Sequence, residues 1–368
     1  MILYVKKKHK NYSKGISMAI DFVFNEQSSG KVFDKLLAHN NDPGSLRPWM
    51  DPDNGRCYIT VNNKGKQEVV RVANADTVLT RDAWKQIDTA ILKAARKPLA
   101  IVSDLRGAGL TYGIPGGIGK TVLEGQTMSD INDATMDMDG LNLGADDRPV
   151  FATTYLPLPI IHFDFQFTLR QIQASRDGGA PLDTTMAEMA GRKVSEYLEK
   201  LVLGKLSTYA YAGGTIYGLT NWTSVLTQTM TTPTGANMST TLSEILTMKE
   251  TSKTSKHYGP WNLYFSPAWD KYLDNDYNTS YPNMTLRQRL AQIDGIGTVK
   301  TLNWLTSYDT ILLEMNPEVI RMVVGMEIMT LQWDDSGGLR KNFKVMTIQV
   351  PQLRKDYNDC TGIVYGSI

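Results

Sequence analysis

Residues 156–184, LPLPIIHFDFQFTLRQIQASRDGGAPLDT, join a predicted strand to a long predicted helix. From Ile161 to Arg170 apolar and polar residues alternate strictly, and this period of two predicts a strand with one buried face. Gly178 and Gly179 then interrupt the pattern. The face predicted to be buried consists of Ile161, Phe163, Phe165, Phe167 and Leu169.

A long helix is predicted after this break. Thr185-Met186-Ala187-Glu188 has the form of a capping box, in which a threonine and a glutamate three residues later satisfy backbone N–H groups. Apolar residues then recur at helical spacing for about five to six turns, and Gly204 is expected to end the helix. Its predicted apolar face consists of Met186, Ala190, Val194, Tyr197, Leu198, Leu201 and Val202.

This strand-to-helix unit resembles the major capsid proteins of tailed bacteriophages and the related bacterial encapsulin shell proteins, which share the HK97-type fold. The resemblance extends upstream to residues 80–88 and downstream through residues 265–269, and so covers roughly residues 79–368. The motifs that carry it stand in the order and spacing of the family. They are Ala174-Ser175-Arg176, Pro181-Leu182-Asp183-Thr184 and Ile216-Tyr217-Gly218-Leu219-Thr220-Asn221.

The resemblance implies an α+β fold, namely an HK97-like capsid fold. Its parts are an N-terminal arm, a long E-loop hairpin, a peripheral (P) domain with a spine helix, and an axial (A) domain. The implied boundaries are 1–78 for the N-terminal arm, 79–106 for the N-terminal helix of the P-domain, 107–149 for the E-loop, 150–221 for the P-domain strand and spine helix, 222–318 for the A-domain, and 319–368 for the C-terminal strands of the P-domain.

Local patterns predict further elements. An apolar stripe of Trp84, Ile87 and Ile91 predicts a helix that ends by Pro98. Thr241-Leu242-Ser243-Glu244 predicts a helix cap. The other predicted elements are a hairpin of 58–61 with 69–72, a strand over 261–265, a helix start at Ser266-Pro267, a short helix over 285–293, strands over 320–324, 326–333 and 343–350 that return to the first domain's sheet, and a strand over 363–365 that closes that sheet.

Residues 107–149 are glycine-rich and then acidic, and the stretch is too long for an ordinary connection within a compact domain. Folded as a two-stranded hairpin with ~20 residues in each limb, it would project about 65 Å. Such an element cannot bury itself, so we expect it to lie across an adjacent subunit. The residues predicted to contact a neighbour are Gly113, Lys120, Asp130, Asp137, Asp139 and Leu143.

The chain has a net charge of +1, so no overall basic excess indicates nucleic-acid binding. A local basic cluster near the N-terminus leaves two interpretations open, which are a solvated tail and an inward-facing arm that contacts DNA or a scaffolding protein. The cluster consists of Lys6, Lys7, Lys8, Lys10 and Lys14.

Three other sequence features bear on location and chemistry. No apolar run approaches the ~20 residues of a membrane span. Apolar residues 1–5 precede Lys6, which is the wrong order for a signal peptide, and a cytosolic protein is expected. Cys57 and Cys360 are expected to be packing residues and not a disulfide or a zinc site.

Two motifs approach known binding loops without completing them. Residues 114–121, IPGGIGKT, lack the first glycine of a P-loop, because Ile114 stands there. Asp137-Met138-Asp139-Gly140 resembles a calcium loop, but its glycine falls at the fourth position instead of the sixth. We therefore expect no catalytic residue, metal site or cofactor. An enzyme that binds ATP through Lys120 is the alternative from another class.

The resemblance implies a major capsid protein, not an enzyme, that self-assembles into the icosahedral shell around the dsDNA genome of a tailed phage or prophage. Its implied partners are further copies of itself in hexamers and pentamers, a portal, scaffolding and decoration proteins, and packaged dsDNA, bound on the inner face without sequence preference; no membrane is implied. The implied location is the virion capsid, after assembly in the cytoplasm of a bacterial host. An encapsulin-like compartment around a cargo enzyme is the alternative, although residues 1–78 have no encapsulin counterpart.

Overall fold

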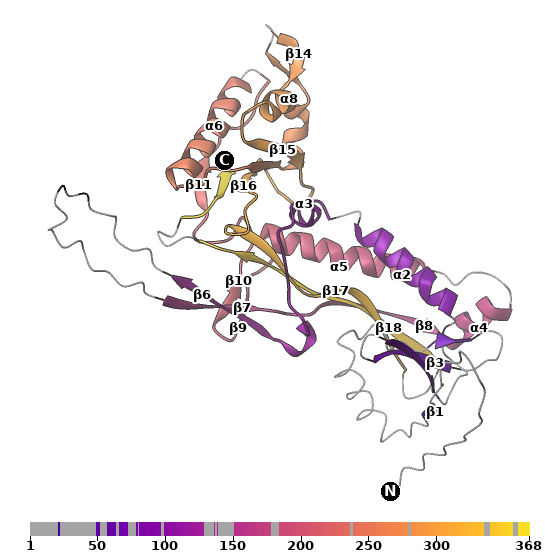
Figure 1. Ribbon diagram of the computed structural model, residues 1–368. Coiled ribbons are helices and arrows are strands. Elements are labelled where there is room, and N and C mark those ends of the chain that lie inside the picture. Colours follow the sequence, from indigo (N-terminus) through magenta and orange to yellow (C-terminus); the bar gives the residue numbers. More distant parts are fainter. Residues whose placement is uncertain are drawn as a thin grey trace. The chain divides into compact units, whose positions relative to one another are not determined.

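The computed structural model of the chain describes residues 21–22, 49–51, 57–63, 66–72, 79, 81–96, 99–128, 136, 138, 151–177, 184–235, 238–278, 281–334, 339–355 and 360–368. The chain divides into two compact units (Figure 1). The first comprises Met1–Gln86, Thr168–Leu182 and Asp334–Lys341. The second comprises Ile87–Phe167, Asp183–Trp333 and Asn342–Ile368.

The first unit contains a four-stranded sheet in the order β1 (Asp21–Phe22), β4 (Lys66–Val72), β3 (Cys57–Asn63) and β2 (Trp49–Met50). Strands β3 and β4 are antiparallel in continuous register, and the predicted hairpin is confirmed. Cys57 is buried in β3 and Cys360 is half-buried, as predicted for packing residues.

The predicted strand over 161–170 is shorter than expected, because β8 (Ile161–Thr168) is followed at once by α4 (Leu169–Asp177). A capping box starts this helix. The amide of Gln171 donates to Oγ1 of Thr168 at 3.3 Å, and the amide of Thr168 donates to Oε1 of Gln171 at 2.9 Å. The prediction that Leu169 lies on a strand face is therefore wrong.

The second unit contains a four-stranded sheet in the order β5 (Thr111–Gly113), β17 (Ile320–Asp334), β18 (Arg340–Leu353) and β8. The C-terminal strands thus return to the sheet of β8, as predicted. The two strands predicted over 320–324 and 326–333 are one strand, which runs through Gly325.

An aromatic cluster joins β8 to β18 in this sheet. Phe165 stacks on Phe343 with ring centroids 5.2 Å apart, and Phe167 meets the same ring edge-on at 5.4 Å. Ile161 is buried as well, but Phe163 is 39% exposed, so the prediction that Phe163 is buried is wrong. Alternation identifies the face of a strand but does not tell how far the neighbouring elements cover it.

Three helices accompany this sheet, namely α2 (Arg81–Arg96), α3 (Ile101–Gly107) and α5 (Thr185–Leu203). The apolar stripe predicted for α2 is confirmed, since Trp84, Ile87 and Ile91 are buried. Helix α5 packs against the second half of α2 so tightly that a Cβ at Gly191 would lie 2.8 Å from the carbonyl oxygen of Ile91.

Helix α5 differs from its prediction at the start and on its surface. Its N-cap is Thr184 and not Thr185, and no side-chain hydrogen bond caps it, so the predicted capping box is wrong. Met186 and Tyr197 are 46% and 48% exposed, contrary to prediction, because the helix turns its small residues Ala187 and Gly191 inward. The other five predicted apolar-face residues are buried.

The predicted end of α5 at Gly204 is confirmed, and the segment 216–221 completes it. Gly204 has a φ of +77°, the left-handed conformation that glycine adopts readily. The amide of Leu219 donates to the carbonyl of Val202 at 2.9 Å, and Oγ1 of Thr220 donates to the carbonyl of Leu203 at 2.8 Å. These bonds satisfy carbonyls that a helix end leaves unpaired.

A second core of this unit lies around a five-stranded sheet, in the order β11 (Leu226–Thr229), β19 (Ile363–Ser367), β16 (Thr310–Glu314), β12 (Trp261–Phe265) and β15 (Ile296–Thr301). Strand β19 is parallel to β11 and antiparallel to β16. The prediction that 363–365 closes the sheet of β8 is therefore wrong, because Val364 packs into this second core instead.

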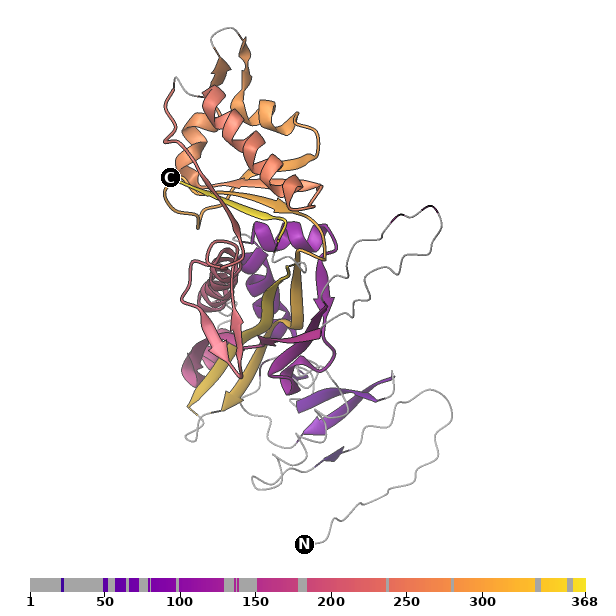
Figure 2. The ribbon, with the colours of Figure 1, turned by 90° about the vertical axis from the view of Figure 1, so that its left-hand side faces the viewer.

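Helices α6 (Met238–Thr254), α7 (Asp270–Leu273) and α8 (Leu286–Ala291) cover this sheet (Figure 2). The cap predicted at Thr241 is wrong, since Thr241 is a buried residue inside α6. The strand β12 agrees with its prediction, and a 3-10 turn, η3 (Pro267–Trp269), begins at Ser266-Pro267 as expected. Helix α8 has a complete capping box between Thr285 and Gln288.

Three short two-stranded sheets complete the described part of the chain. They pair β6 (Val122–Met128) with β7 (Phe151–Pro157), β9 (Tyr209–Tyr211) with β10 (Gly214–Ile216), and β13 (Asp276–Asn278) with β14 (Tyr281–Thr285). Between β5 and β6 lies a 3-10 turn, η2 (Gly117–Gly119), and a Cβ at Gly117 would overlap the backbone of Gly325 in β17. Residues 111–119 therefore lie against the sheet, and the described hairpin begins at Val122.

Candidate functional site

The β6–β7 hairpin is part of the second unit, and its base packs against the rest of that unit. Its seven Cα pairs run from Val122↔Pro157 to Met128↔Phe151. Strand β10 packs against β7 so closely that a Cβ at Gly214 would overlap the carbonyl oxygen of Tyr155. The side chains of Phe151 and Tyr155 on β7 are 60% and 45% exposed. The hairpin thus presents aromatic surface on a firmly attached base.

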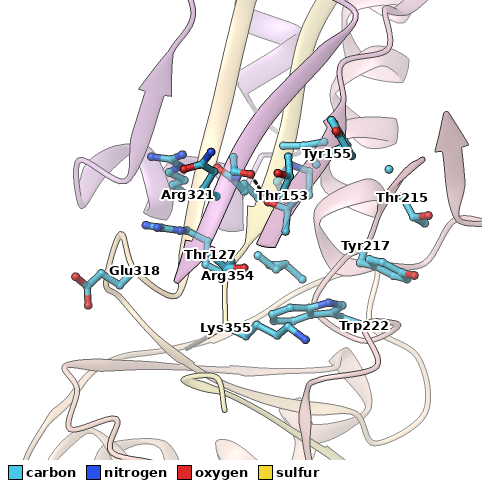
Figure 3. A pocket seen from close by; sticks show the side chains of 18 of the residues that line it. Thr127, Thr153, Tyr155, Thr215, Tyr217, Trp222, Glu318, Arg321, Arg354 and Lys355 are labelled. Atoms are coloured by element: carbon cyan, nitrogen blue, oxygen red, sulfur yellow. Dashed lines mark hydrogen bonds between the residues drawn. The ribbon is translucent and has the colours of Figure 1, made fainter. Parts of the chain in front are cut away.

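A cavity of about 760 Å³ lies beside this hairpin (Figure 3). Its walls come from β6 and β7, from β10 and the turn after it, and from the adjoining ends of β17 and β18. Thr127 and Thr153 line it on the hairpin side, and Tyr217 and Trp222 line it on the other. We call it the arginine pocket, because Arg321 and Arg354 both line it. Lys355 and Glu318 line it as well.

The sheet brings the two arginines together although 33 positions separate them in the sequence. Arg321 is the second residue of β17, and Arg354 directly follows β18. The amide of Arg354 donates to the carbonyl of Val319 at 2.9 Å, which fixes the end of one strand beside the start of the other.

In the described part of the chain the two guanidinium groups have neutral hydrogen-bond partners. Arg321 donates from Nε to Oε1 of Gln352 at 2.6 Å and lies 4.3 Å from the ring centroid of Tyr112. Arg354 donates to the carbonyl of Pro317 at 3.4 Å. Burial, and then the like charge of Arg354, lowers the pKa of Arg321 below its ordinary value. An anion in the pocket would relieve this repulsion.

A buried polar junction connects the two cores of the second unit. Glu199 on α5 accepts hydrogen bonds from the amides of Ala100 and Ile101 at 3.1 and 2.8 Å, and so caps the N-terminus of α3. Within α3, Asp104 accepts from the hydroxyl of Tyr264 at 3.0 Å and pairs with Lys300 at 2.6 Å. Helices α5 and α3 and the five-stranded sheet are therefore linked by hydrogen bonds to Glu199 and Asp104 and by one ion pair.

Glu199 gives this junction a pH dependence. Burial raises the pKa of Glu199 from 4.5 to about 7, although the backbone amides that it accepts act in the opposite direction. Because this pKa is higher in the folded chain, the stability that protonation of Glu199 supplies is full below pH 4.5 and is lost as the pH rises through about 7.

Glu199→Gln should therefore flatten the pH dependence of stability between pH 4.5 and 7. The wild-type chain should lose up to about 3 kcal/mol more than the variant across this range, as a shift of this size predicts. Thermal unfolding followed by circular dichroism at several pH values measures this. Glu196→Gln, on the same helix with its carboxylate paired to Lys193 at 3.2 Å, is the control. Parallel curves for wild type and Glu199→Gln would contradict the assignment.

The structure describes two of the residues predicted to contact a neighbour. Gly113 is the exposed last residue of β5, paired with Val324 of β17, and Lys120 is exposed just before β6. The remaining predicted contact residues Asp130, Asp137, Asp139 and Leu143, and the basic cluster Lys6, Lys7, Lys8, Lys10 and Lys14, lie outside the described residues.

The segment with a partial P-loop pattern, residues 114–121, continues into strand β6 and not into a helix. A P-loop binds phosphate with backbone N–H groups at the start of a helix, so this local geometry differs from that of the motif. Among the described residues, His, Cys, Asp and Glu side chains form no group of three or more that could hold a metal ion. No helix in the described ranges is long and apolar enough to cross a membrane.

Sequence inspection does not single out Arg321, Arg354 or Glu199. The two arginines are brought together by strand pairing, and Glu199 is a charged residue within an amphipathic helix pattern. The position of Glu199 in the sequence does give one indication that its side chain is buried. It falls one position after Leu198, on the apolar face of α5, where an ionisable side chain requires a buried partner.

Several solved structures have a similar fold. A virus-like particle from Pyrococcus furiosus is 17% identical, with a TM-score of 0.55 over 77% of this chain and 99% of that chain. The capsid of Myoviridae phage XM1 is 9% identical, with a TM-score of 0.55 over 70% and 89% of the two chains. A structure from Mycobacterium phage Bobi is 12% identical, with a TM-score of 0.52 over 72% of this chain and 90% of that chain. At these identities the likeness shows the fold, and the predicted α+β, HK97-like capsid fold is confirmed.

The chain belongs to a sequence family as well. Residues 73–366 match DUF6260, described as a family of unknown function, and the chain is a member of it. A search of the curated proteins finds no match.

Proposed function

We propose that this chain is a major capsid protein, which self-assembles into the icosahedral shell around the dsDNA of a tailed phage or prophage. The observation that carries the proposal is the fold, which follows the chains of a virus-like particle and a phage capsid over 99% and 89% of their lengths. The exposed hairpin base adds to it, because Phe151 and Tyr155 give the aromatic surface that association would cover.

The assembly proposed here is non-covalent and non-enzymatic. Interfaces of about 800 Å² per partner are individually moderate, but several engaged at once raise the effective concentration steeply. Under this proposal the partners are copies of the chain in hexamers and pentamers, a portal, scaffolding and decoration proteins, and packaged dsDNA. The location is the virion capsid, and assembly takes place in the host cytoplasm.

Between a phage capsid and an encapsulin-like compartment, the length of the chain favours the capsid. The virus-like particle chain is matched over 99% of its length by only 77% of this chain, and the family match begins at residue 73. The segment before it is additional material, of the kind expected for the arm of a capsid subunit.

Expression of the full chain alone tests the proposal. Analytical ultracentrifugation and negative-stain electron microscopy should show closed shells, or rings of five and six subunits. A chain that stays monomeric at every concentration and binds Mg-ATP through Lys120 would overturn the proposal and favour the enzyme alternative.

Removal of residues 1–16 should weaken the binding of dsDNA and leave folding unchanged. The segment carries five lysines, and each phosphate contact contributes about 0.9 to the slope of log affinity against log salt. The slope should therefore fall by up to about 4.5. Filter binding at several salt concentrations measures this slope. A chain with the same five lysines changed to glutamine is the control, because it removes the charges without removing the segment. An unchanged slope would show that the lysine cluster is a solvated tail that does not contact DNA.

A further inference from the structure

The arginine pocket brings together two guanidinium groups that no carboxylate neutralises in the described part of the chain. Arg321 donates to Oε1 of Gln352 at 2.6 Å. Arg354 donates to the carbonyl of Pro317 at 3.4 Å. Glu318 lines the same pocket but is exposed, and among the described residues it forms an ion pair with neither arginine. A guanidinium has five N–H donors, so most donors of both groups are available to a ligand.

A phosphate monoester matches this pair of cations. It carries a charge of about −1.5 to −2 at pH 7 and offers three acceptor oxygens, whereas a single carboxylate offers one charge and two oxygens. Arg321 is already held in place by Gln352 and by the ring of Tyr112, whose centroid lies 4.3 Å away, so little side-chain freedom is lost on binding. Lys355 lines the pocket too, but it already interacts with another group, so the two arginines are the cations that bind the ligand.

The opposite wall of the pocket supplies aromatic surface. Tyr217 and Trp222 line it and are half-buried (Figure 3). A nucleobase placed against these rings would stack on them, because every base has a π-face. The hydroxyl groups of Thr127 and Thr153 on the hairpin side can hydrogen-bond a sugar. The cavity, of about 760 Å³, has the size of pockets that hold a whole small molecule.

We propose that the arginine pocket binds a nucleoside 5′-monophosphate, with the phosphate on Arg321 and Arg354 and the base against Tyr217 and Trp222. The bound molecule would bridge the β6–β7 hairpin, the turn after β10 and the ends of β17 and β18, which all line the pocket. This activity goes beyond the proposed function, because it belongs to the single subunit and does not depend on whether the chain forms shells.

Four probes separate the two halves of the ligand. In isothermal titration calorimetry of the full chain, adenosine 5′-monophosphate (AMP) should bind at least about tenfold more tightly than ribose 5-phosphate, which lacks the base, and than adenosine, which lacks the phosphate. Inorganic phosphate should bind more weakly than AMP as well. If inorganic phosphate bound as tightly as AMP, the rings would take no part and the proposal would fail. It would also fail if AMP did not bind at millimolar concentration.

Substitutions assign each half of the ligand to its wall. Arg354→Gln should weaken the binding of AMP at least about tenfold and leave that of adenosine unchanged, because it removes only a phosphate contact. Trp222→Leu should weaken the binding of both AMP and adenosine and leave that of ribose 5-phosphate unchanged. Arg354 is exposed, so its variant should fold, and circular dichroism checks this. An unchanged affinity of Arg354→Gln for AMP would overturn the proposal.

Matched controls test whether the pocket itself is the site. Arg340→Gln, which changes an exposed arginine at the other end of β18, should bind AMP as the wild type does. Lys120→Gln should also bind AMP normally, and a loss of binding there would place the nucleotide at the partial P-loop segment instead. A short dsDNA duplex with hydroxyl ends should not displace AMP, since it presents neither an unstacked base nor a phosphate monoester. Displacement would show a contact with the DNA backbone and refute the proposal.

Sedimentation of the same samples reports assembly separately from binding. A chain that binds AMP but forms no shells or rings would contradict the proposed function alone. Shells that bind no AMP would contradict this inference alone.

Discussion

A chain in which an Asn-Gly turn replaces residues 129–150 should fold normally and form no shells. The last described pair of the hairpin is Met128↔Phe151, so a two-residue turn can close β6 and β7 in their native register. The base of the hairpin and its packing against β10 would remain. The change removes residues 129–150 and with them the contacts that we propose they make with a neighbouring subunit.

The expected loss of assembly is large because the contacts of a shell act together. In the proposed shell each subunit is held by several interfaces, and the loss of one lowers the effective concentration at the others. We expect shell yield, measured by sedimentation and electron microscopy, to fall at least about a hundredfold. The melting temperature should change little. Normal shells from this variant would remove the hairpin from the assembly mechanism, and a fall in the melting temperature would show that the segment stabilises the subunit itself.

The structure also defines how this deletion must be made. The sequence suggests Gly113 to Leu143 as the segment to remove, and such a deletion should leave folded subunits that fail to close shells. From the structure we instead expect this deletion to impair folding. The deletion would take the end of β5, the turn at Gly117 that packs on Gly325, and all of β6. Strand β7 would then lose its partner.

Prediction from sequence succeeded where a pattern is local and complete. Gly204 ends α5 because a left-handed residue is needed there, and Thr285 caps α8 because its partner Gln288 lies three residues away. The apolar stripe of α2 and the hairpin of β3 and β4 are likewise set by neighbouring residues. These signals do not depend on what the rest of the chain does.

Prediction failed where two local signals compete or where tertiary contacts decide. Thr168 and Gln171 form a cap inside a strand-like alternation, and the cap wins because it satisfies backbone N–H groups. Val364 has the same apolar pattern for either sheet, and only its packing assigns β19 to the second core. The arginine pocket depends on the pairing of β17 and β18, which brings Arg321 beside Arg354 across 33 positions of sequence.

The turn at 216–221 provides the other large expected effect. Gly218→Ala should prevent the chain from folding stably, because a Cβ at Gly218 would overlap the backbone nitrogen of Gly204. The same turn supplies the bonds from Leu219 and Thr220 that close α5, and the amide of Gly218 itself donates to Oδ1 of Asn221 at 2.7 Å. Added bulk would push these groups apart.

The expected cost exceeds that of ordinary overpacking. Adding volume to a packed site costs about 1–3 kcal/mol when side chains can adjust, but here the opposing atoms are backbone at the end of a helix. We expect a loss of more than about 3 kcal/mol in the free energy of unfolding, measured by chemical denaturation. Gly235→Ala is the matched control, since a Cβ there would meet no atom within 4 Å.

A stable Gly218→Ala chain would show that the segment 216–221 can move away from α5. In that case the motif would serve something other than closing the helix, because the hydrogen bonds to Val202 and Leu203 would be dispensable. A destabilised chain would instead explain why the motif has its form. The glycine permits the close approach to Gly204, Thr220 satisfies a helix carbonyl, and Asn221 holds the glycine amide in place.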